Sequence, residues 1–292
     1  MTATTASRLV TVRQALSDAA RALEAAQVDA PRLSAEALLS HTLDLSRGQL
    51  LARLSETLPA GRRTRYQSLV DRCASGEPLA YVLGHHEFYG LDFCVDPRVL
   101  IQRPETEILV ETAIELAGPP ASDVRLADVG TGSGAIAVTL AVRLPQARIV
   151  AVDISPDAIA VAQANAQRHG VVDRIEFRVG DLLTPLRAPV DLIAANLPYV
   201  RSREWAFLAT SIRRHEPAVA FNGGDDGLAL VGRLLRDAPR ALRPGGSILL
   251  EIGASHGEAA VEHARDTFPN AHIAVKTDYA GLDRLLVIRT SG

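Results

Sequence analysis

From about residue 105 onward, the chain alternates apolar strand-like segments with helix-like segments, and this alternation limits the fold more than any other feature. The segments that read as strands are 124–129, 147–154, 175–179, 191–195, 247–252, 272–277 and 284–289. Those that read as helices are 133–144, 157–169, 227–242 and 257–268. Strands joined by helices run parallel, so the pattern predicts a seven-stranded, mostly parallel, doubly wound α/β sheet. The last two strands are too close in sequence for a crossover helix, and we expect them to pair antiparallel.

The N-terminal part instead carries apolar side chains at helical spacing. One such series runs from Val12 to Leu23, and Pro31 suits the first turn of a second helix that continues to about Leu43. Further helical segments cover about 47–58 and 62–73. We therefore expect a helical bundle domain over residues 1–76, with a role in recognition or packing, since none of its residues is arranged for chemistry.

Residues 77–104 differ from both neighbouring parts. Aromatic and β-branched residues surround glycines at 78–84 and 88–95, which is typical of a β-hairpin. We expect this segment to be a linker hairpin that joins the helical bundle to an α/β domain over residues 105–292.

Composition excludes several classes of protein. The net charge of −3 argues against a chain that binds polyanions, and two cysteines make neither a disulfide framework nor a metal cluster. No apolar stretch approaches the roughly 18–20 residues that span a bilayer. The first residues lack the pattern of a signal peptide, so we expect a cytoplasmic protein.

A glycine-rich loop follows the first strand of the α/β part, at 128–134. Gly130, Gly132 and Gly134 allow a sharp turn and a close approach to a ligand, which the next helix faces with its free N–H groups. Asp153 ends the next strand, where a carboxylate can accept hydrogen bonds from both hydroxyls of a ribose. The spacing is tighter than that of dinucleotide enzymes and suits S-adenosylmethionine, with NAD binding or a simple tight turn as alternatives. Asp181 and Leu182 would flank the adenine.

The tetrad Asn196, Leu197, Pro198 and Tyr199 follows another apolar strand, about 65 residues after the loop. The Asn196 side chain and the Leu197 main chain offer two carbonyl acceptors that can hold both N–H bonds of a planar NH₂ group and aim its nitrogen at a methyl donor. Pro198 stiffens the turn, and the Tyr199 ring can stack on the flat substrate group. The alternative is an ordinary turn at the end of a strand. Together with the glycine loop, the tetrad predicts an S-adenosylmethionine-dependent N-methyltransferase.

Two other groups of polar residues are candidates for a functional site. The sequence His85-His86-Glu87 suggests metal ligands, but no further ligands recur at zinc-like spacing, so no metal site is predicted. Residues 215–217 and 222–227 read as a loop and a helix cap beside the site. A direct ligand role for Glu216 stays open.

Several segments in the same order resemble the HemK/PrmC-type protein-(glutamine-N5) methyltransferases, which modify the glutamine of the Gly-Gly-Gln loop in class I peptide release factors. The resemblance covers about residues 30–290 and includes 78–84, 87–89, 103–107, 128–134, 196–199, 216–217, 223–227 and 250–253. It implies a helical domain for the protein substrate, a hairpin and a Rossmann-like class I methyltransferase domain. The cofactor contacts that it implies come from Gly130, Thr131, Gly132, Ser133, Gly134, Asp153, Leu182 and Asn196. The substrate glutamine would be held by Asn196, Leu197, Pro198 and Tyr199.

Three residues depart from the family pattern. Leu197 replaces a usual proline, which preserves the main-chain acceptor but loosens the turn. Gln102 replaces a proline before Arg103, and Leu182 stands where an aromatic residue often stacks on adenine. One alternative is therefore a catalytically weak binding module. Others are a methyltransferase for a ribosomal-protein glutamine or for adenine N6 in nucleic acid, although the latter usually needs a basic surface. We expect a monomer that acts on release factors, with no nucleic-acid or membrane partner.

Overall fold

The computed structural model describes residues 10–119 and 123–292, and it divides into two compact units. The first unit ends at Gly84 and also includes Thr210–His215, and the second holds the remaining residues. The predicted start of the helical domain, at residues 1–9, lies outside the described residues. No helix within the two described ranges is both long and apolar enough to cross a bilayer.

The first unit is helical, as the spacing of its apolar residues predicts. Its helices are α1 (Val12–Ala25), α2 (Pro31–Leu43), α3 (Arg47–Ala52), α4 (Ala60–Ala74), α5 (Leu79–Leu83) and α9 (Thr210–His215). Leu23, Leu38, Leu39 and Leu50 are completely buried in its core. Pro31 begins α2, as predicted, whereas the third helix ends at Ala52 rather than near residue 58.

The hairpin prediction was wrong for residues 78–84 and right for the residues that follow. Residues 79–83 form α5, which Gly84 ends with a left-handed backbone at φ +78°. Tyr81 and Val82 favour strands intrinsically, but burial decides the outcome, since Val82 packs into the core of the first unit. Only β1 (His85–Phe88) and β2 (Leu91–Cys94) form the antiparallel hairpin. Its Phe88 packs in the core of the second unit.

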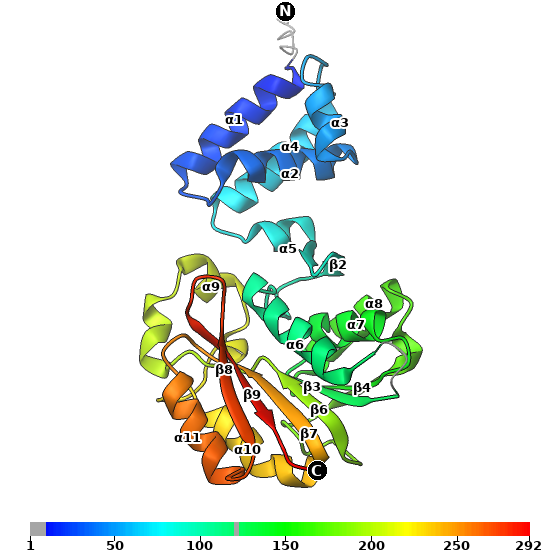
Figure 1. Cartoon of the computed structure of the whole chain (residues 1–292). Coiled ribbons are helices and arrows are strands. Elements are labelled where there is room, and N and C mark those ends of the chain that lie inside the picture. Colours follow the sequence, from blue (N-terminus) through cyan, green and yellow to red (C-terminus); the bar gives the residue numbers. More distant parts are fainter. Residues whose placement is uncertain (1–9, 120–122) are drawn as a thin grey trace, which may run out of the picture. The chain divides into compact units, whose positions relative to one another are not determined.

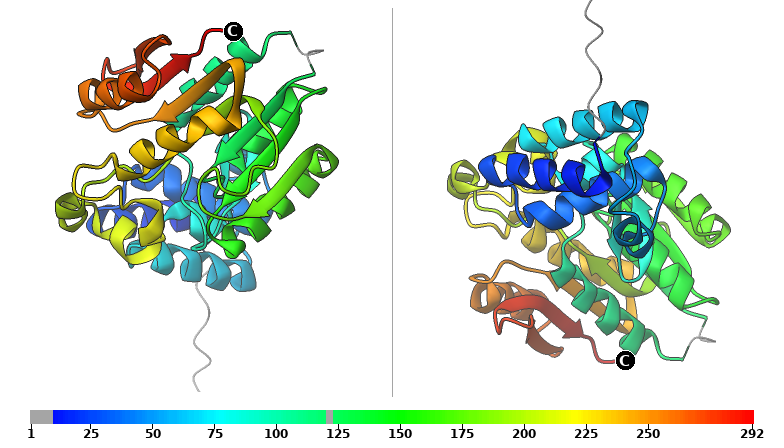
Figure 2. Two further views of the ribbon diagram at one scale, coloured as in Figure 1. Left: turned by 90° about the horizontal axis from the view of Figure 1, so that it is seen from below. Right: turned by 90° about the horizontal axis from the view of Figure 1, so that it is seen from above.

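The second unit contains the predicted seven-stranded sheet, and the two views of Figure 2 show its twist. Its strands are β3 (Arg125–Val129), β4 (Arg148–Asp153), β5 (Ile175–Val179), β6 (Val190–Ala195), β7 (Leu242–Glu251), β8 (His272–Thr277) and β9 (Asp283–Arg289). Their order is β5-β4-β3-β6-β7-β9-β8. Only β9 runs in the direction opposite to the other six strands. This confirms both the mostly parallel sheet and the antiparallel pairing of the last two strands.

Helices cover both faces of the sheet (Figure 1). One face carries α6 (Glu107–Ala117), α7 (Ala135–Arg143) and α8 (Pro156–Arg168), and the other carries α10 (Ala229–Ala241) and α11 (Gly257–Thr267). Short 3₁₀ helices occupy Pro104–Thr106 (η1), Val172–Arg174 (η2), Ser202–Phe207 (η3) and Ala218–Ala220 (η4). Each face has its own apolar core, which explains why the central strands are apolar on both sides.

The strand order reverses beside β3. From β3 the chain moves to β4 and β5 on one side, then returns to β6 on the other. Ligands in such sheets bind where the order reverses, outside the carboxyl ends of the strands. The glycine loop follows β3 and the tetrad follows β6, so the two motifs leave neighbouring strands at the same edge.

Candidate active site

A cavity of about 660 Å³ lies at the carboxyl ends of β3, β4 and β6, entirely within the second unit. The predicted site residues that line it are Gly130, Gly132, Asp153, Asp181, Leu182, Asn196, Leu197 and Pro198. The predicted residues that do not line it are Thr131, Ser133, Gly134 and Tyr199. The structure therefore brings predicted residues from four different segments of the sequence around one space.

The three glycines of the loop adopt backbone conformations that other residues rarely take, and two of them also lie in crowded surroundings. All three have positive φ angles, +77° at Gly130, +55° at Gly132 and +82° at Gly134. A Cβ on Gly134 would lie 3.0 Å from the Cβ of Ala162, so this glycine lets α7 start close against α8. A Cβ on Gly130 would lie 3.3 Å from Cδ2 of Leu197, so the loop passes close to the tetrad.

Asp128 holds the loop from below and received no role in the sequence analysis. Its side chain is completely buried, and Oδ2 accepts hydrogen bonds from Thr131 Oγ1 at 2.6 Å and from the Ala137 N–H at 3.0 Å. Burial raises the pKa of Asp128 to about 7, because few groups replace the lost water. Thr131 thus fastens the loop to its own strand rather than facing the cavity.

Ser133 is also held from behind the cavity wall. Its hydroxyl accepts a hydrogen bond from the Gln102 side-chain amide, and its main-chain carbonyl accepts one from Asn165 Nδ2 at 2.8 Å. Asn165 also bonds both main-chain groups of Cys94, at 2.7 and 3.0 Å. The β1–β2 hairpin and the glycine loop are therefore tied to the same buried side chain, and Gln102, one of the departures from the family, supports the loop.

Asp153 lies at the end of β4, where the sequence places it. Its carboxylate accepts hydrogen bonds from the Gly132 N–H at 2.8 Å and the Ser155 N–H at 2.9 Å. Burial raises the pKa of Asp153, and these N–H groups oppose the rise. Each oxygen keeps a further lone pair, so the carboxylate can still accept ligand hydroxyls.

Asp181 and Leu182 line the cavity after β5, the strand that pairs with β4. Asp181 forms a partly exposed ion pair with Arg233, another lining residue. Leu182 is buried and has a φ of +49°, a left-handed conformation that branched side chains rarely adopt. Strain at a cavity-lining residue is a feature of binding sites, where the surrounding structure enforces it.

The tetrad is positioned by two residues that are distant in sequence. Asn196 Nδ2 donates a hydrogen bond to Thr106 Oγ1 at 3.1 Å, and Thr106 Oγ1 donates to Glu251 Oε2 at 2.7 Å. Burial raises the pKa of Glu251 to about 7, opposed by the Thr106 hydrogen bond and by the positive charge of Arg284. Sequence reasoning missed Thr106 and Glu251, although a carboxylate at the end of the apolar strand β7 repeats the pattern of Asp153.

Tyr199 turns toward this buried carboxylate. Its hydroxyl donates to Glu251 Oε1 at 3.4 Å, and burial raises the pKa of Tyr199 to about 12. The ring lies against Gly253, where an added Cβ would be 3.4 Å from Cδ2 of the ring. The predicted stacking of this ring on a substrate stays a prediction, because the ring does not line the cavity.

Glu216 fastens a loop, and both of its carboxylate oxygens are engaged. Oε2 accepts the Ile101 N–H at 3.1 Å, and Oε1 accepts a hydrogen bond from Arg103 at 2.6 Å. The residue is only 6% exposed. Since residues 217–220 line the cavity directly after it, Glu216 fixes one wall rather than acting as the free ligand group that the sequence left open.

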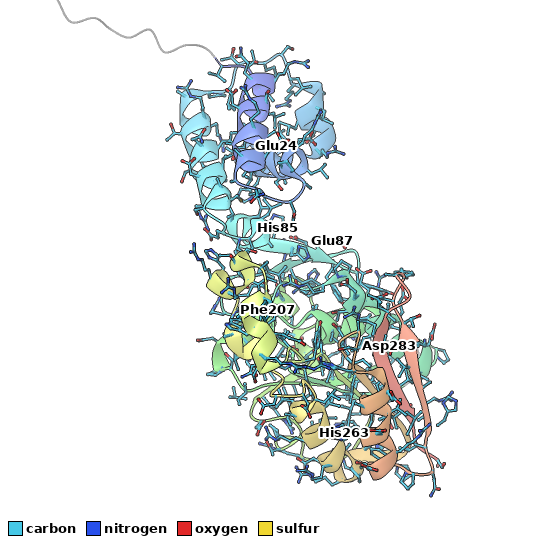
Figure 3. All side chains as sticks on the ribbon, turned by 90° about the vertical axis from the view of Figure 1, so that its left-hand side faces the viewer. Glu24, His85, Glu87, Phe207, His263 and Asp283 are labelled. Atoms are coloured by element: carbon cyan, nitrogen blue, oxygen red, sulfur yellow. The ribbon has the colours of Figure 1, made fainter. Side chains whose placement is uncertain are left out.

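That wall is mainly apolar and includes Val200, Trp205, Pro217 and Val219. The Trp205 ring lies 5.8 Å from the ring of Phe221, measured between centroids. Sequence reasoning placed residues 215–217 beside the site but missed Trp205, although the only tryptophan of the chain, six residues after the tetrad, was a signal. Phe207, at the end of the 3₁₀ helix η3 that also contains Trp205, is 87% exposed; Figure 3 labels this residue.

The His85-His86-Glu87 segment forms β1 of the hairpin, where Figure 3 labels His85 and Glu87. His85 Nδ1 hydrogen bonds with Asp92 Oδ1 at 2.6 Å across the hairpin. Within the described residues, no three or more His, Cys, Asp and Glu side chains are grouped so that they could hold a metal ion.

Two family models match the chain. The PrmC N-terminal domain matches residues 14–84, and a methyltransferase domain matches residues 120–281. The first match coincides with the helical unit and the second with most of the sheet, so both parts of the chain have known relatives.

Full-length relatives agree with these matches. A release factor glutamine methyltransferase from Moorella thermoacetica is 46% identical over 276 residues, which cover 94% of this chain and 97% of the relative. One from Koribacter versatilis is 42% identical, with 96% and 99% covered. A solved methyltransferase from Pyrococcus furiosus shares the fold, with a TM-score of 0.53 at 16% identity and with 76% and 98% covered. The chain therefore belongs to the release factor glutamine methyltransferase family.

Proposed function

We propose that the chain transfers a methyl group from S-adenosylmethionine to the side-chain amide nitrogen, N5, of the glutamine in the Gly-Gly-Gln loop of class I peptide release factors. One observation carries the proposal. The glycine loop and the tetrad lie close together at the rim of one cavity, since a Cβ on Gly130 would lie 3.3 Å from Leu197 and 3.6 Å from the main-chain oxygen of Asn196. A methyl donor in the loop and an amide in the tetrad would therefore be neighbours. The names of the relatives supply the substrate.

The cavity wall fits an adenosyl ligand. Gly130 and Gly132 leave open backbone at the rim, and Asp153 offers carboxylate oxygens of the kind that bind ribose hydroxyls. Asp181 and Leu182 form the wall that would flank the adenine. When it is bound, S-adenosylmethionine supplies a methyl group already activated by a positively charged sulfur. The protein's task is therefore positioning rather than activation of the donor.

The tetrad performs the positioning. The side-chain oxygen of Asn196 and the main-chain oxygen of Leu197 accept the two N–H bonds of the substrate carboxamide, which draws electron density onto its nitrogen. Leu197 is 4% exposed and packs toward Gly130, so burial of its side chain holds the turn in the absence of the family's proline. The proton leaves to solvent after the methyl group has been transferred, and no general base is needed beforehand.

The two units divide the work. We propose that residues 1–76 recognise the release factor, that 77–104 link the parts and that 105–292 carry out the transfer. The protein acts in the cytoplasm as a monomer. The net charge of −3 does not favour binding to nucleic acid.

A methylation assay tests the proposal. The full chain is incubated with methyl-labelled S-adenosylmethionine and a class I release factor, and the modified residue is located by mass spectrometry. The control substrate is the same release factor with its loop glutamine replaced by asparagine. We expect label on the glutamine and none on the control. Label on ribosomal protein or on adenine in nucleic acid, with none on the release factor, would contradict the proposal.

A further inference from the structure

We propose that Thr106 and Glu251 are positioning residues, which determine that the Asn196 side chain presents its oxygen, and not its nitrogen, to the substrate amide. The inference rests on the proposed function and concerns residues that touch neither cofactor nor substrate. An asparagine amide has a donor end and an acceptor end of nearly equal size, so shape alone does not choose between them. The choice is decisive for a carboxamide substrate, since a wrongly turned Asn196 would set N–H against N–H.

The donors and acceptors of the three side chains determine which end of the Asn196 amide faces the substrate. A threonine hydroxyl has one hydrogen, and Thr106 gives it to Glu251 Oε2 at 2.7 Å. The Thr106 oxygen can then only accept, so the end of Asn196 that lies 3.1 Å away is the NH₂ end. An ionised carboxylate accepts and never donates, so Glu251 fixes the direction of both hydrogen bonds. We call the two hydrogen bonds from Asn196 to Thr106 and from Thr106 to Glu251 the relay.

The sheet register brings the three residues together. Ala195 of β6 pairs with Leu250 of β7, so the next residues, Asn196 and Glu251, leave adjacent strand ends. Thr106 enters between them from the last position of η1. The relay therefore depends on three segments that only the folded sheet makes neighbours.

Burial makes the relay effective. Thr106 is 4% and Glu251 2% exposed, so water does not compete for their hydrogen bonds. The second oxygen of Glu251 accepts from the Tyr199 hydroxyl at 3.4 Å. The carboxylate is thus held from both sides, and the geometry that orients Asn196 exists before a substrate arrives.

A pair of substitutions at one position tests the relay. Thr106→Val keeps the shape and removes the hydroxyl, whereas Thr106→Ser keeps the hydroxyl. We expect kcat for release-factor methylation to fall by about tenfold to a hundredfold in Thr106→Val, the scale of a misplaced reacting group. Thr106→Ser should stay within about threefold of the unaltered protein, because the hydroxyl is retained. The Kd for S-adenosylhomocysteine, measured by calorimetry, should be unchanged in both, which separates lost positioning from lost cofactor binding.

A second readout does not depend on turnover. The side-chain NH₂ signals of Asn196, assigned by comparison with Asn196→Asp, should exchange slowly with solvent in the unaltered chain and in Thr106→Ser, and quickly in Thr106→Val. Should Thr106→Val fail to fold, Glu251→Leu breaks the relay from its other end. Slow exchange and an unchanged kcat in the variant that breaks the relay would overturn the inference. An unaltered chain that protects these hydrogens but leaves the release factor unmethylated would instead overturn the proposed function.

Discussion

The two loops that meet at the cavity are held in place in different ways. The glycine loop is fastened by contacts that span from three residues, for Thr131 and Asp128, to 32 residues, for Ser133 and Asn165. The tetrad is fastened by Thr106, 90 residues from Asn196, which is fixed in turn by Glu251, 145 residues from Thr106. One side of the site is therefore a local consequence of the sequence, while the other exists only after the sheet has closed.

The strongest test of this difference removes the tetrad's acceptor. Asn196→Ala should lower kcat for release-factor methylation by about a hundredfold to a thousandfold, comparable to the loss of one preorganised hydrogen-bonding group in other enzymes. Initial rates with saturating S-adenosylmethionine provide the measurement. Asn270→Ala, an exposed asparagine in the same unit, is the matched control and should leave kcat unchanged. A fully active Asn196→Ala would show that the tetrad does not hold the substrate.

The local side of the site is tested by Gly134→Ala. Its φ of +82° and the 3.0 Å approach to Ala162 predict both backbone strain and a clash that pushes α7 away from α8. The free energy of unfolding should fall by more than about 1 kcal/mol, and cofactor affinity should fall with it, because the loop moves. Denaturant unfolding and calorimetric titration give the two quantities.

Gly170→Ala is the matched control for this change. Gly170 also has a positive φ, +67°, but nothing lies within 4 Å of an added Cβ, and it is not among the residues that line the cavity. It should lose about 1 kcal/mol from backbone strain alone and keep its cofactor affinity. Equal effects of the two substitutions on affinity would mean that the close contact with α8 does not shape the loop.

The same contrast explains how much the sequence could predict. Period-two and helical patterns, glycines at strand ends and a carboxylate 20 residues later are local signals, and they place the sheet, the glycine loop and Asp153 correctly. Burial and tertiary contact decide the rest. Tyr81 and Val82 read as strand and form a helix in which both are buried, with Val82 in the core of the helical unit.

Apart from Asp128, which holds the loop three residues after it, the residues that sequence reasoning missed act through long-range contacts. Thr106 and Glu251 lie in segments that the family resemblance includes, yet nothing in their spacing indicates that they meet each other. Trp205 and Glu216 shape the cavity wall from a stretch between 202 and 220 whose short helices have no clear periodicity. Binding residues at the ends of strands can be predicted from a sequence, whereas the side chains that position them cannot.

The pH dependence of kcat should show whether turnover depends on the ionisation of Glu251 in the relay or of Asp128 beside the glycine loop. The relay needs ionised Glu251, whose pKa burial raises to about 7, so kcat should rise with pH through that value. The charged and titratable groups that face Glu251 are Arg284, Glu105 and Tyr199, and Arg284 is itself held by Asp278 at 3.0 Å. The measurement is kcat under saturating substrates between about pH 6 and pH 8.5.

Glu251→Gln distinguishes this carboxyl from Asp128, whose pKa burial also raises to about 7. Glutamine stays neutral, like the protonated carboxyl, so the variant should have a lowered kcat that no longer changes with pH through about 7. An acid limb that persists in Glu251→Gln would assign the pH dependence to another group, with Asp128 beneath the loop as the first candidate.

The smallest expected effect concerns Leu182, the strained residue in the predicted adenine wall. Leu182→Phe should tighten the Kd for S-adenosylhomocysteine by about twofold to tenfold, since an aromatic contact adds about 0.5–1.5 kcal/mol to simple burial. Both side chains carry a Cβ at a φ of +49°, so the backbone strain cancels in the comparison. Leu182→Asn tolerates this backbone better but gives up the burial of the leucine side chain, so it should lower the free energy of unfolding and should not tighten the Kd. If asparagine improves affinity as much as phenylalanine, relief of strain rather than stacking limits binding at this wall.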